Sequence, residues 1–299
     1  MRILVTADLH YDIARSREPA TKLARSVCGI GGDAIVLVGD SAGANLEILV
    51  DCLELFDDFK GRKFFVPGNH CLWSQDGESS LERYERIIPE TASQVGWTML
   101  DHNPAMLGDI GLVGSVGWYD YSFADEALGI PLDFYRAKVA PGAAKYLGGY
   151  EDLLERHRDR LTSEHMGLGA RWMDGRHVDL GMTDEQFTTL LCDRLAKQLE
   201  ELAPRVKRVV AFVHHLAFPA AIPPDRPARF AFAAAYMGSY RLGETLRKCP
   251  KLTHVYCGHS HWFDRRRVGE IEVVNVGSTY IKKLLEVLDL PDARCGENS

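Results

Sequence analysis

The stretch MRILVTADLH, residues 1–10, decides the fold predicted for this chain. Its residues 3–5, Ile-Leu-Val, form an uncharged apolar run, which predicts a β-strand buried on both faces. Asp8 and His10 follow this run, and in extended backbone two side chains at that spacing project to the same side. A carboxylate and an imidazole that converge at the end of a buried strand predict a metal-binding pair. The alternative is an N-terminal strand that simply runs into a polar loop.

Four further apolar runs end in the same kind of side chain. They cover residues 34–38, 63–66, 209–213 and 253–257. The alternation of such runs with helical periodicity predicts a parallel sheet with helices on its faces, in which ligands bind beyond the carboxyl ends of the strands. The metal-competent side chains that follow the four runs are Asp40, Asn69, His70, His214, His215, His259 and His261. Because all five strand ends agree in this respect, we expect these side chains to form a metal site.

Glycine precedes three of these clusters, at Gly39, Gly68 and Gly258. Glycine allows the backbone to turn sharply, so that the next side chain can face an ion. The other histidines do not directly follow a buried strand, and we expect surface or structural roles for them. These are His102, His157, His165, His177 and His254.

The five clusters resemble the motifs of the calcineurin-like metallophosphoesterases. In this sequence the motifs are Asp8-Leu9-His10, Gly39-Asp40, Gly68-Asn69-His70-Cys71, His214 and Gly258-His259-Ser260-His261. The resemblance implies a four-layer α/β/β/α sandwich and two metal ions. By the family pattern, Asp8, His10 and His261 hold the first ion, Asn69, His214 and His259 hold the second, and Asp40 bridges the two. His70 lies near the leaving group in this pattern and acts as the general acid.

The chemistry implied by this resemblance is the metal-dependent hydrolysis of phosphate mono- or diesters. Two adjacent divalent ions lower the pKa of a shared water, generate a bridging hydroxide nucleophile and clamp the phosphoryl oxygens. Ligands of the carboxylate, amide and imidazole types suit manganese or iron, including a mixed-valence pair, with zinc as a further candidate. A protonated imidazole can supply the proton that the leaving alkoxide needs.

The sequence departs from the family pattern at two places. Cys71 stands where an Asp or Glu usually follows Gly-Asn-His, and no Asp-Arg-Gly follows Asp40 as it does in protein phosphatases. The missing Arg and Asp disfavour a phosphoprotein substrate, and a small-molecule or nucleotide-type substrate is expected. The residue that orients His70 cannot be identified from the sequence.

Four residues are candidates for the substrate pocket: His215, Cys71, Trp118 and Tyr119. His215 neighbours His214, and the family ligand is usually the first histidine of such a pair. For Cys71, a small buried side chain that fills the space of the usual carboxylate is the alternative. For Trp118 and Tyr119, the alternative to stacking on a substrate ring is packing in the core.

The 299 residues, of which 46% are hydrophobic, predict a globular protein, and we expect a single metallophosphoesterase domain over residues 1–299. The stretch 119–182 interrupts the alternation of strands and helices between the third and fourth ligand clusters. It has weak periodicity, and we interpret it as an insertion near the active site that sets substrate choice.

The net charge of −7 argues against non-specific binding to nucleic acid or membranes. The only dense basic run, residues 265–267, could bind phosphate or a nucleic-acid backbone, or it could form the solvated face of a strand. Seven scattered cysteines without a Cys-x-x-Cys motif predict reduced thiols, and no signal peptide or membrane-spanning run is evident, so a cytoplasmic location is expected. The oligomeric state cannot be derived from the sequence.

Three other functions compete with the hydrolase. A nuclease of the same fold requires a continuous basic channel, which the acidic balance disfavours. A non-catalytic metal-binding module should have gaps at the ligand or general-acid positions, and the sequence has none. A metal-dependent amidohydrolase would carry His-x-His after its first strand, whereas here Asp-x-His comes first and His-x-His last.

Overall fold

The structure, a computed structural model, describes residues 1–75, 77–224 and 227–291 and contains two β-sheets. The first sheet has the strand order β11-β1-β2-β3-β4, and the second has the order β5-β6-β7-β8-β10-β9. The first is built from β1 (Arg2–Thr6), β2 (Ala34–Val38), β3 (Arg62–Val66), β4 (Thr98–Met99) and β11 (Glu286–Asp289). The second is built from β5 (Ala105–Leu107), β6 (Ile110–Ser115), β7 (Arg208–Val213), β8 (Leu252–Cys257), β9 (Asp264–Val268) and β10 (Ile271–Asn275).

Both sheets are mainly parallel, and their antiparallel strands are edge strands. In the first sheet, β1, β2, β3 and β4 run parallel, and β11 pairs with β1 in the antiparallel direction. In the second, β6, β7, β8 and β10 run parallel, while β5 and β9 are antiparallel edge strands. The carboxyl ends of β1, β2 and β3 therefore meet at one edge of the first sheet, and those of β7 and β8 meet at one edge of the second.

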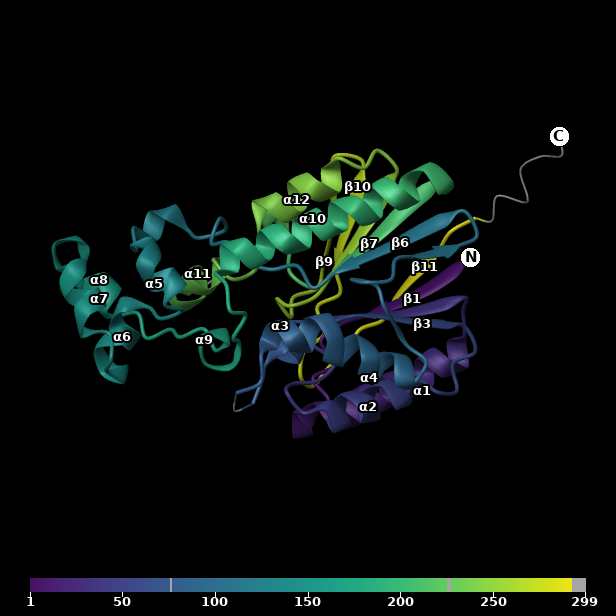
Figure 1. The fold of residues 1–299 in the computed structure, drawn as a ribbon, viewed down its shortest axis with the longest axis horizontal. Helices are drawn as coiled ribbons and strands as arrows, with labels where there is room; N and C mark the ends of the chain where they lie inside the picture. The colour runs from purple at the N-terminus through teal and green to yellow at the C-terminus, as the bar shows by residue number, and fades with distance from the viewer. Residues whose placement is uncertain (76, 225–226, 292–299) are drawn as a thin grey trace.

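Helices cover the outer face of each sheet, as Figure 1 shows. The first sheet is covered by α1 (Ala14–Ile30), α2 (Leu46–Glu54) and α4 (Ile88–Gln94), and the second by α10 (Asp184–Leu202) and α12 (Tyr240–Arg247). Between the sheets, apolar side chains of the two sets of strands form one buried cluster, which includes Val5, Val36, Phe64, Val210, Phe212 and Tyr256. The predicted four-layer α/β/β/α sandwich is confirmed.

Two of the helix starts follow from capping residues. The side chain of Asn45 accepts hydrogen bonds from the backbone N–H groups of Glu47 (2.8 Å) and Ile48 (3.2 Å) at the start of α2. Thr183 and Gln186 form a capping box at the start of α10, in which each side chain accepts from the backbone of the other residue. Among the described residues, no helix combines the length and the apolar composition that a membrane crossing requires.

The stretch 119–182 folds mainly as short helices. They are α5 (Leu132–Arg136), α6 (Pro141–Leu147), α7 (Glu151–Arg156), α8 (Ser163–Met166) and α9 (Asp174–His177). In Figure 1 most of them gather with α11 (Ala228–Ala234) at the left of the view, to one side of the two sheets. Helices this short have no long apolar stripe, which explains the weak periodicity of this part of the sequence. Residues 292–299, at the end of the predicted domain, lie outside the described residues.

Candidate metal centre

Eight polar side chains from five strand ends come together at one edge of the sandwich. They are Asp8 and His10 after β1, Asp40 after β2, Asn69 and His70 after β3, His214 after β7, and His259 and His261 after β8. Three groups have ligand atoms that all lie within 4.8 Å of one another: Asp8 with His10 and His261, His10 with Asp40 and His70, and Asp40 with His214 and His259. Because His10 and Asp40 each belong to two groups, the groups form one continuous cluster.

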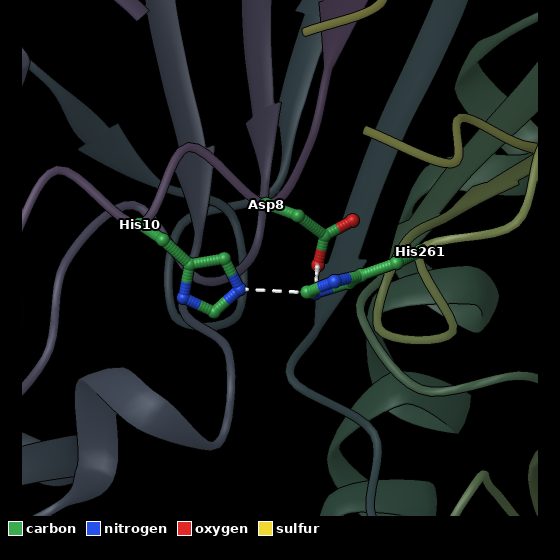
Figure 2. A group of neighbouring side chains, drawn as sticks. All are labelled: Asp8, His10 and His261. Atoms are coloured by element: carbon green, nitrogen blue, oxygen red, sulfur yellow. Dashed lines mark hydrogen bonds and ion pairs between the residues drawn. The ribbon is translucent and has the colours of Figure 1, made fainter. Parts of the chain in front are cut away.

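The first group joins the two sheets (Figure 2). Nε2 of His10 lies 3.0 Å from Nε2 of His261, which in turn lies 3.8 Å from Oδ1 of Asp8. Asp8 and His10 are fully buried, and Oδ2 of Asp8 has no hydrogen-bond partner among the described residues. A buried carboxylate oxygen without a partner is costly, so this environment favours a bound cation.

The backbone at these strand ends is left-handed rather than extended. Positive φ angles occur at Asp8 (55°), His10 (43°), Asp40 (45°), His259 (68°) and His261 (54°). The expectation that extended backbone aligns Asp8 and His10 is therefore wrong, because β1 ends at Thr6 and both residues lie in the turn that follows. Such backbone costs about 1–2 kcal/mol for each residue other than glycine, and it clusters at functional sites.

The glycines that precede three of these residues have two different roles. Gly39 has a φ of 85°, and a Cβ at this position would lie 1.8 Å from Nδ1 of His214. Gly68 and Gly258 do not have positive φ; a Cβ there would lie 2.1 Å from Oδ1 of Asp40 and 2.7 Å from Oδ2 of Asp8, respectively. The predicted sharp turn therefore applies to Gly39, whereas Gly68 and Gly258 allow the two carboxylates to approach the backbone closely.

Asp40 is the anionic centre of the cluster. Its Oδ2 lies 3.4 Å from Nε2 of His214 and 3.6 Å from Nε2 of His10, and its Oδ1 accepts a hydrogen bond from the backbone N–H of His70 at 3.0 Å. Burial opposes the charge of Asp40, but the neighbouring His214 and His70 hold the pKa of this carboxyl well below its usual range. Burial likewise opposes the charge of His214, and contact with Asp40 outweighs it and raises the pKa of His214 to about 9.

Lone pairs converge in the second half of the cluster. His214 donates through Nδ1 to the carbonyl oxygen of Val38 (3.2 Å), and His259 donates through Nε2 to that of Tyr236 (3.2 Å). The remaining ring nitrogens, Nε2 of His214 and Nδ1 of His259, face each other at 3.2 Å. Nδ1 of His259 is an acceptor, and Nε2 of His214 is one when a cation replaces the second proton that Asp40 favours on this ring. Oδ1 of Asn69, a third acceptor, lies 3.2 Å from Nε2 of His214. Acceptors that meet in this way repel one another unless a proton or a cation lies between them.

This set of donors fits divalent metal ions. Carboxylate, amide and imidazole groups are the ligands that manganese, iron and zinc accept in proteins. The ring nitrogens that point outward from His214 and His259 are held by backbone carbonyls, which is the usual way in which ligating histidines are oriented.

A pocket of about 370 Å³ opens beside the cluster. Its lining consists of Asp40, Asn69, His70, Trp73, Arg171, Trp172, Met173, Asp174, His259, His261 and Tyr280. Arg171 is half-buried and has no ion-pair partner among the described residues. A pocket of this size beside ligand-type side chains suits a small molecule.

His70 lies on the wall of this pocket. Its ring stacks on the indole of Trp73 with centroids 3.9 Å apart, and meets the ring of His10 edge-on at 4.8 Å. His177, for which we expected a surface or structural role, stacks on the same indole at 4.6 Å. A ring nitrogen of His70 lies within 4.8 Å of a carboxylate oxygen of Asp40, the same limit that holds for the proposed metal ligands. Distance from Asp40 therefore does not distinguish His70 from a ligand.

The described residues that line the pocket do not include Cys71, Trp118, Tyr119 or His215. Cys71 is 1% exposed and packs in the core beneath the helices of the first sheet. Burial raises the pKa of its thiol to about 11, so the reactive thiolate form is disfavoured. The substitution of this cysteine for the usual carboxylate thus leaves a small buried side chain at that position.

The other three residues are buried behind or next to residues of the pocket wall and do not line the pocket. Trp118 and Tyr119 are fully buried, and the hydroxyl of Tyr119 donates to Asp174, a residue of the pocket wall. The ring of His215 lies 4.3 Å from that of His259, and its Nδ1 donates to the carbonyl oxygen of Val116 at 2.9 Å. Tyr119 and His215 therefore contact residues of the pocket wall, and Trp118 packs against the rings of both.

Sequence reasoning did not identify Trp73 or any single residue of 171–177, although it expected the stretch 119–182, which contains the latter, near the active site. Arg171, Trp172 and Asp174 lie on the pocket wall, although this stretch follows no buried strand and belongs to the region of weak periodicity. A search for polar residues at strand ends cannot find them, and the interrupted alternation of strands and helices marks only the stretch 119–182 as a whole.

The sequence model of the calcineurin-like phosphoesterases matches residues 1–263. This chain belongs to the calcineurin-like phosphoesterase family. It is a metallophosphoesterase, a hydrolase of phosphoesters, and the family typically binds a dinuclear metal centre. The resemblance inferred from the strand-end motifs is therefore confirmed.

Solved structures share the fold of this metallophosphoesterase at low sequence identity. Phosphopantetheinyl hydrolase from Mycobacterium tuberculosis has a TM-score of 0.68 at 16% identity, with 98% of this chain and 96% of that chain covered. Protein TT1561 of Thermus thermophilus has a TM-score of 0.54 at 14% identity, with coverage of 96% and 98%. A dimetal phosphatase from Danio rerio has a TM-score of 0.53 at 14% identity, with coverage of 94% and 88%. A comparison with curated proteins finds no match.

Proposed function

We propose that this metallophosphoesterase hydrolyses small-molecule phosphate mono- or diesters, including nucleotide-type esters, at a dinuclear metal centre. The convergence of three acceptors from His214, His259 and Asn69 beside the charged Asp40 is the observation that supports this function best. In the proposed assignment, one ion is held by Asp8, His10 and His261, the other by Asn69, His214 and His259, and Asp40 contacts both.

We propose manganese or iron as the ions, with zinc as a further candidate. Two divalent ions supply Lewis acidity and a water of lowered pKa when they are bound. The protein contributes the orientation of the ligands. Backbone carbonyl oxygens accept hydrogen bonds from Nδ1 of His214 and Nε2 of His259. These hydrogen bonds fix which nitrogen of each ring faces the proposed metal centre.

His70 is the proposed general acid. Its half-buried ring lies on the pocket wall next to Asp40, and the stack on Trp73 limits its rotation. From this position a protonated imidazole can donate to the oxygen that leaves as the P–O bond breaks, so the leaving group departs as an alcohol rather than as an alkoxide.

Arg171 supports a substrate with a second anionic group. A guanidinium binds phosphate and carboxylate oxygens through paired hydrogen bonds, and this one has no ion-pair partner among the described residues. The pocket of about 370 Å³ is the size expected for a small molecule rather than for a folded protein substrate.

Ion pairs within the basic run 265–267 count against the nuclease alternative. Arg265 forms ion pairs with Glu272 and Glu286, and Arg266 forms one with Asp264. Two of the three arginines in this run are therefore neutralised by carboxylates of the same surface, which opposes a channel for a polyanion. The non-catalytic module is distinguished by an activity assay alone.

Two broader expectations are part of the same proposal. The six described cysteines are all free thiols, which supports a reducing, cytoplasmic environment. The stretch 119–182 is proposed as an insertion into one domain of residues 1–299. Its contribution of Arg171, Trp172 and Asp174 to the pocket wall supports a role in substrate choice.

Metal titration combined with an ester panel tests the function. The purified chain should bind two equivalents of Mn²⁺ by calorimetry and hydrolyse phosphomonoesters, cyclic nucleotides or diesters only when it is loaded. Asp40→Asn should weaken both ions and lower kcat by about 10³-fold, because several kcal/mol of charge stabilisation depend on the ions. Asp51→Asn, the same change on an exposed residue of α2, is the matched control and should behave as wild type.

Two results would contradict the proposed function. Saturation at one equivalent would exclude the dinuclear centre. Two bound ions without hydrolysis of any ester would instead support the binding module.

A further inference from the structure

Asp174, the first residue of α9, is a buried carboxylate on the pocket wall. Four neutral groups donate hydrogen bonds to it. Its Oδ1 accepts from Nδ2 of Asn69 (2.9 Å) and from Nε1 of Trp73 (2.7 Å). Its Oδ2 accepts from the hydroxyl of Tyr119 (3.0 Å) and from Nε1 of Trp172 (2.7 Å). This carboxylate therefore connects the stretch 119–182 with the end of β3.

No lysine or arginine of the described residues forms an ion pair with Asp174. Only 1% of the residue is exposed, and a buried charge is stable only when opposite charge or strong hydrogen bonds offset its desolvation. The hydrogen bonds are present, and the proposed second metal ion, one residue away through Asn69, provides the opposite charge.

The contact with Asp174 decides how the amide of Asn69 is turned. An amide offers an oxygen that accepts and an NH₂ group that donates, whereas an ionised carboxylate only accepts. The NH₂ group of Asn69 must therefore face Asp174, and Oδ1 then points towards Nε2 of His214 at 3.2 Å, on the side of the proposed ion. With the amide turned the other way, N–H groups would occupy the ligand position.

The same carboxylate holds the indole on which His70 stacks. Nε1 of Trp73 donates to Oδ1 of Asp174, and the face of that indole lies 3.9 Å from the ring of His70. Asp174 thus acts on both the proposed metal site and the proposed general acid through one neighbour each.

We infer that Asp174 is a positioning residue, which presents the oxygen of Asn69 to the second metal ion and anchors Trp73 against His70. The inference rests on the proposed function, because it assigns Asn69 to that ion. It gives the stretch 119–182 a second role besides substrate choice, since it makes part of this stretch a support of the metal centre.

Asp174→Asn tests the inference with little change in shape. The introduced amide presents a donor to at least one of the four donors that Asp174 now accepts from. We expect the affinity for the second equivalent of Mn²⁺, measured by calorimetry, to fall about 10–100-fold while the first is largely retained. Asp184→Asn is the matched control, because Asp184 is also buried and accepts from an indole and a tyrosine but contacts none of the proposed ligands. It should bind both ions as wild type does, even if the fold is less stable.

Asn69→Asp tests the same contact from the other side. If only the ligand itself mattered, a carboxylate would bind a divalent cation more tightly than an amide does. Because an oxygen would replace the NH₂ group that lies 2.9 Å from Asp174, we expect weaker binding of the second ion instead. The double variant Asn69→Asp/Asp174→Asn restores a donor between the two positions and should recover part of the affinity.

The outcomes separate the inference from the proposed function. A wild-type chain that fails to bind two ions contradicts the proposed function. A wild-type chain with two ions, together with unchanged affinity in Asp174→Asn or tighter binding in Asn69→Asp, overturns the inference. Asn69→Asp gives this answer even if Asp174→Asn does not fold, since its substitution lies at the end of β3 and leaves the carboxylate in place.

Discussion

Two buried carboxylates, Asp174 and Asp184, accept hydrogen bonds from the same kinds of side chain but differ in whether a cation pairs with them. Asp184 accepts from the indole of Trp118 and the hydroxyl of Tyr121, as Asp174 accepts from two indoles and a tyrosine. Asp184 is also paired with the ammonium group of Lys138 at 2.5 Å, whereas no described lysine or arginine pairs with Asp174. Lys138 thus compensates the charge of Asp184, whereas no lysine or arginine of the described residues compensates that of Asp174.

The difference separates a structural region from a functional one. Asp184 begins α10 and fixes it to Trp118 and Lys138, so its contacts hold the fold together. Asp174 reaches Asn69 at the end of β3, so its contacts extend to the proposed metal centre. Hydrogen-bond partners alone do not distinguish the two; the presence or absence of an internal cation does.

The largest effect on the functional side is expected for His70→Ala. Loss of the general acid should lower kcat on alkyl phosphates by about 10²–10⁴-fold, because an alkoxide is a poor leaving group without a proton. Aryl phosphates with good leaving groups should lose much less. Steady-state kinetics on paired alkyl and aryl esters measures the ratio, and calorimetry should still give two metal ions.

The control for this variant is His157→Ala, which removes a histidine whose ring pairs with Asp133 away from the pocket. Its kinetics should match wild type. An equal loss on alkyl and aryl esters in His70→Ala, or the loss of one ion, would assign His70 to the metal instead of to the leaving group.

A third buried carboxylate, Asp101, forms no ion pair with a lysine or arginine of the described residues and contacts none of the proposed metal ligands. It accepts from the backbone N–H of Val116 and from the hydroxyl of Tyr84, its Oδ2 has no partner among the described residues, and burial raises its pKa to about 7. In these three cases the negative charge of the buried carboxylate is offset by a lysine, by the proposed metal ion or by a proton. Asp101 should retain a proton.

This predicts a pH dependence of stability with a definite sign. Between about pH 4 and pH 7 the folded protein keeps the proton of Asp101 while the unfolded chain loses it, so the free energy of unfolding falls as the pH rises, by roughly 4 kcal/mol at most. Asp101→Asn removes this contribution. Urea denaturation at several pH values should show the variant gaining stability relative to wild type from pH 4 to pH 7; a constant difference would contradict the raised pKa.

The strand ends were predictable because two general rules act on them. Buried parallel strands are apolar runs, and their carboxyl ends share an edge, so Asp8, Asp40 and His259 could be expected to meet. The left-handed backbone at these residues could not, because only glycine favours it and the sequence has none at Asp8 or Asp40.

The role of Asp174 could not be predicted from the sequence, for a different reason. Its contact with Asn69 spans 105 residues, and it lies on a helix of four residues that has no apolar stripe. Local periodicity carries no information about such a contact, and a lone Asp in a polar region resembles any surface residue. Arg171 could not be predicted either. It is distinguished by the lack of an ion-pair partner among the residues that the structure describes, and the sequence does not show this.

The smallest effect is expected for Arg171→Gln. This variant tests whether the pocket wall next to Asp174 binds a second anionic group of the substrate. Arg171 lies three residues before Asp174 on the same pocket wall, half-buried and without an ion-pair partner among the described residues. A charge-assisted hydrogen bond at such a site contributes about 1–2 kcal/mol, so KM should rise about tenfold for esters with a second phosphate or carboxylate group. KM for simple monoesters, and kcat for both classes, should stay unchanged, because the guanidinium touches neither the proposed ligands nor the general acid. Arg176→Gln, in an exposed residue of α9 that does not line this pocket, is the matched control. A rise in KM that is equal for both substrate classes would place Arg171 at the reacting phosphoryl group itself, and the pocket would then have no separate site for a second anion.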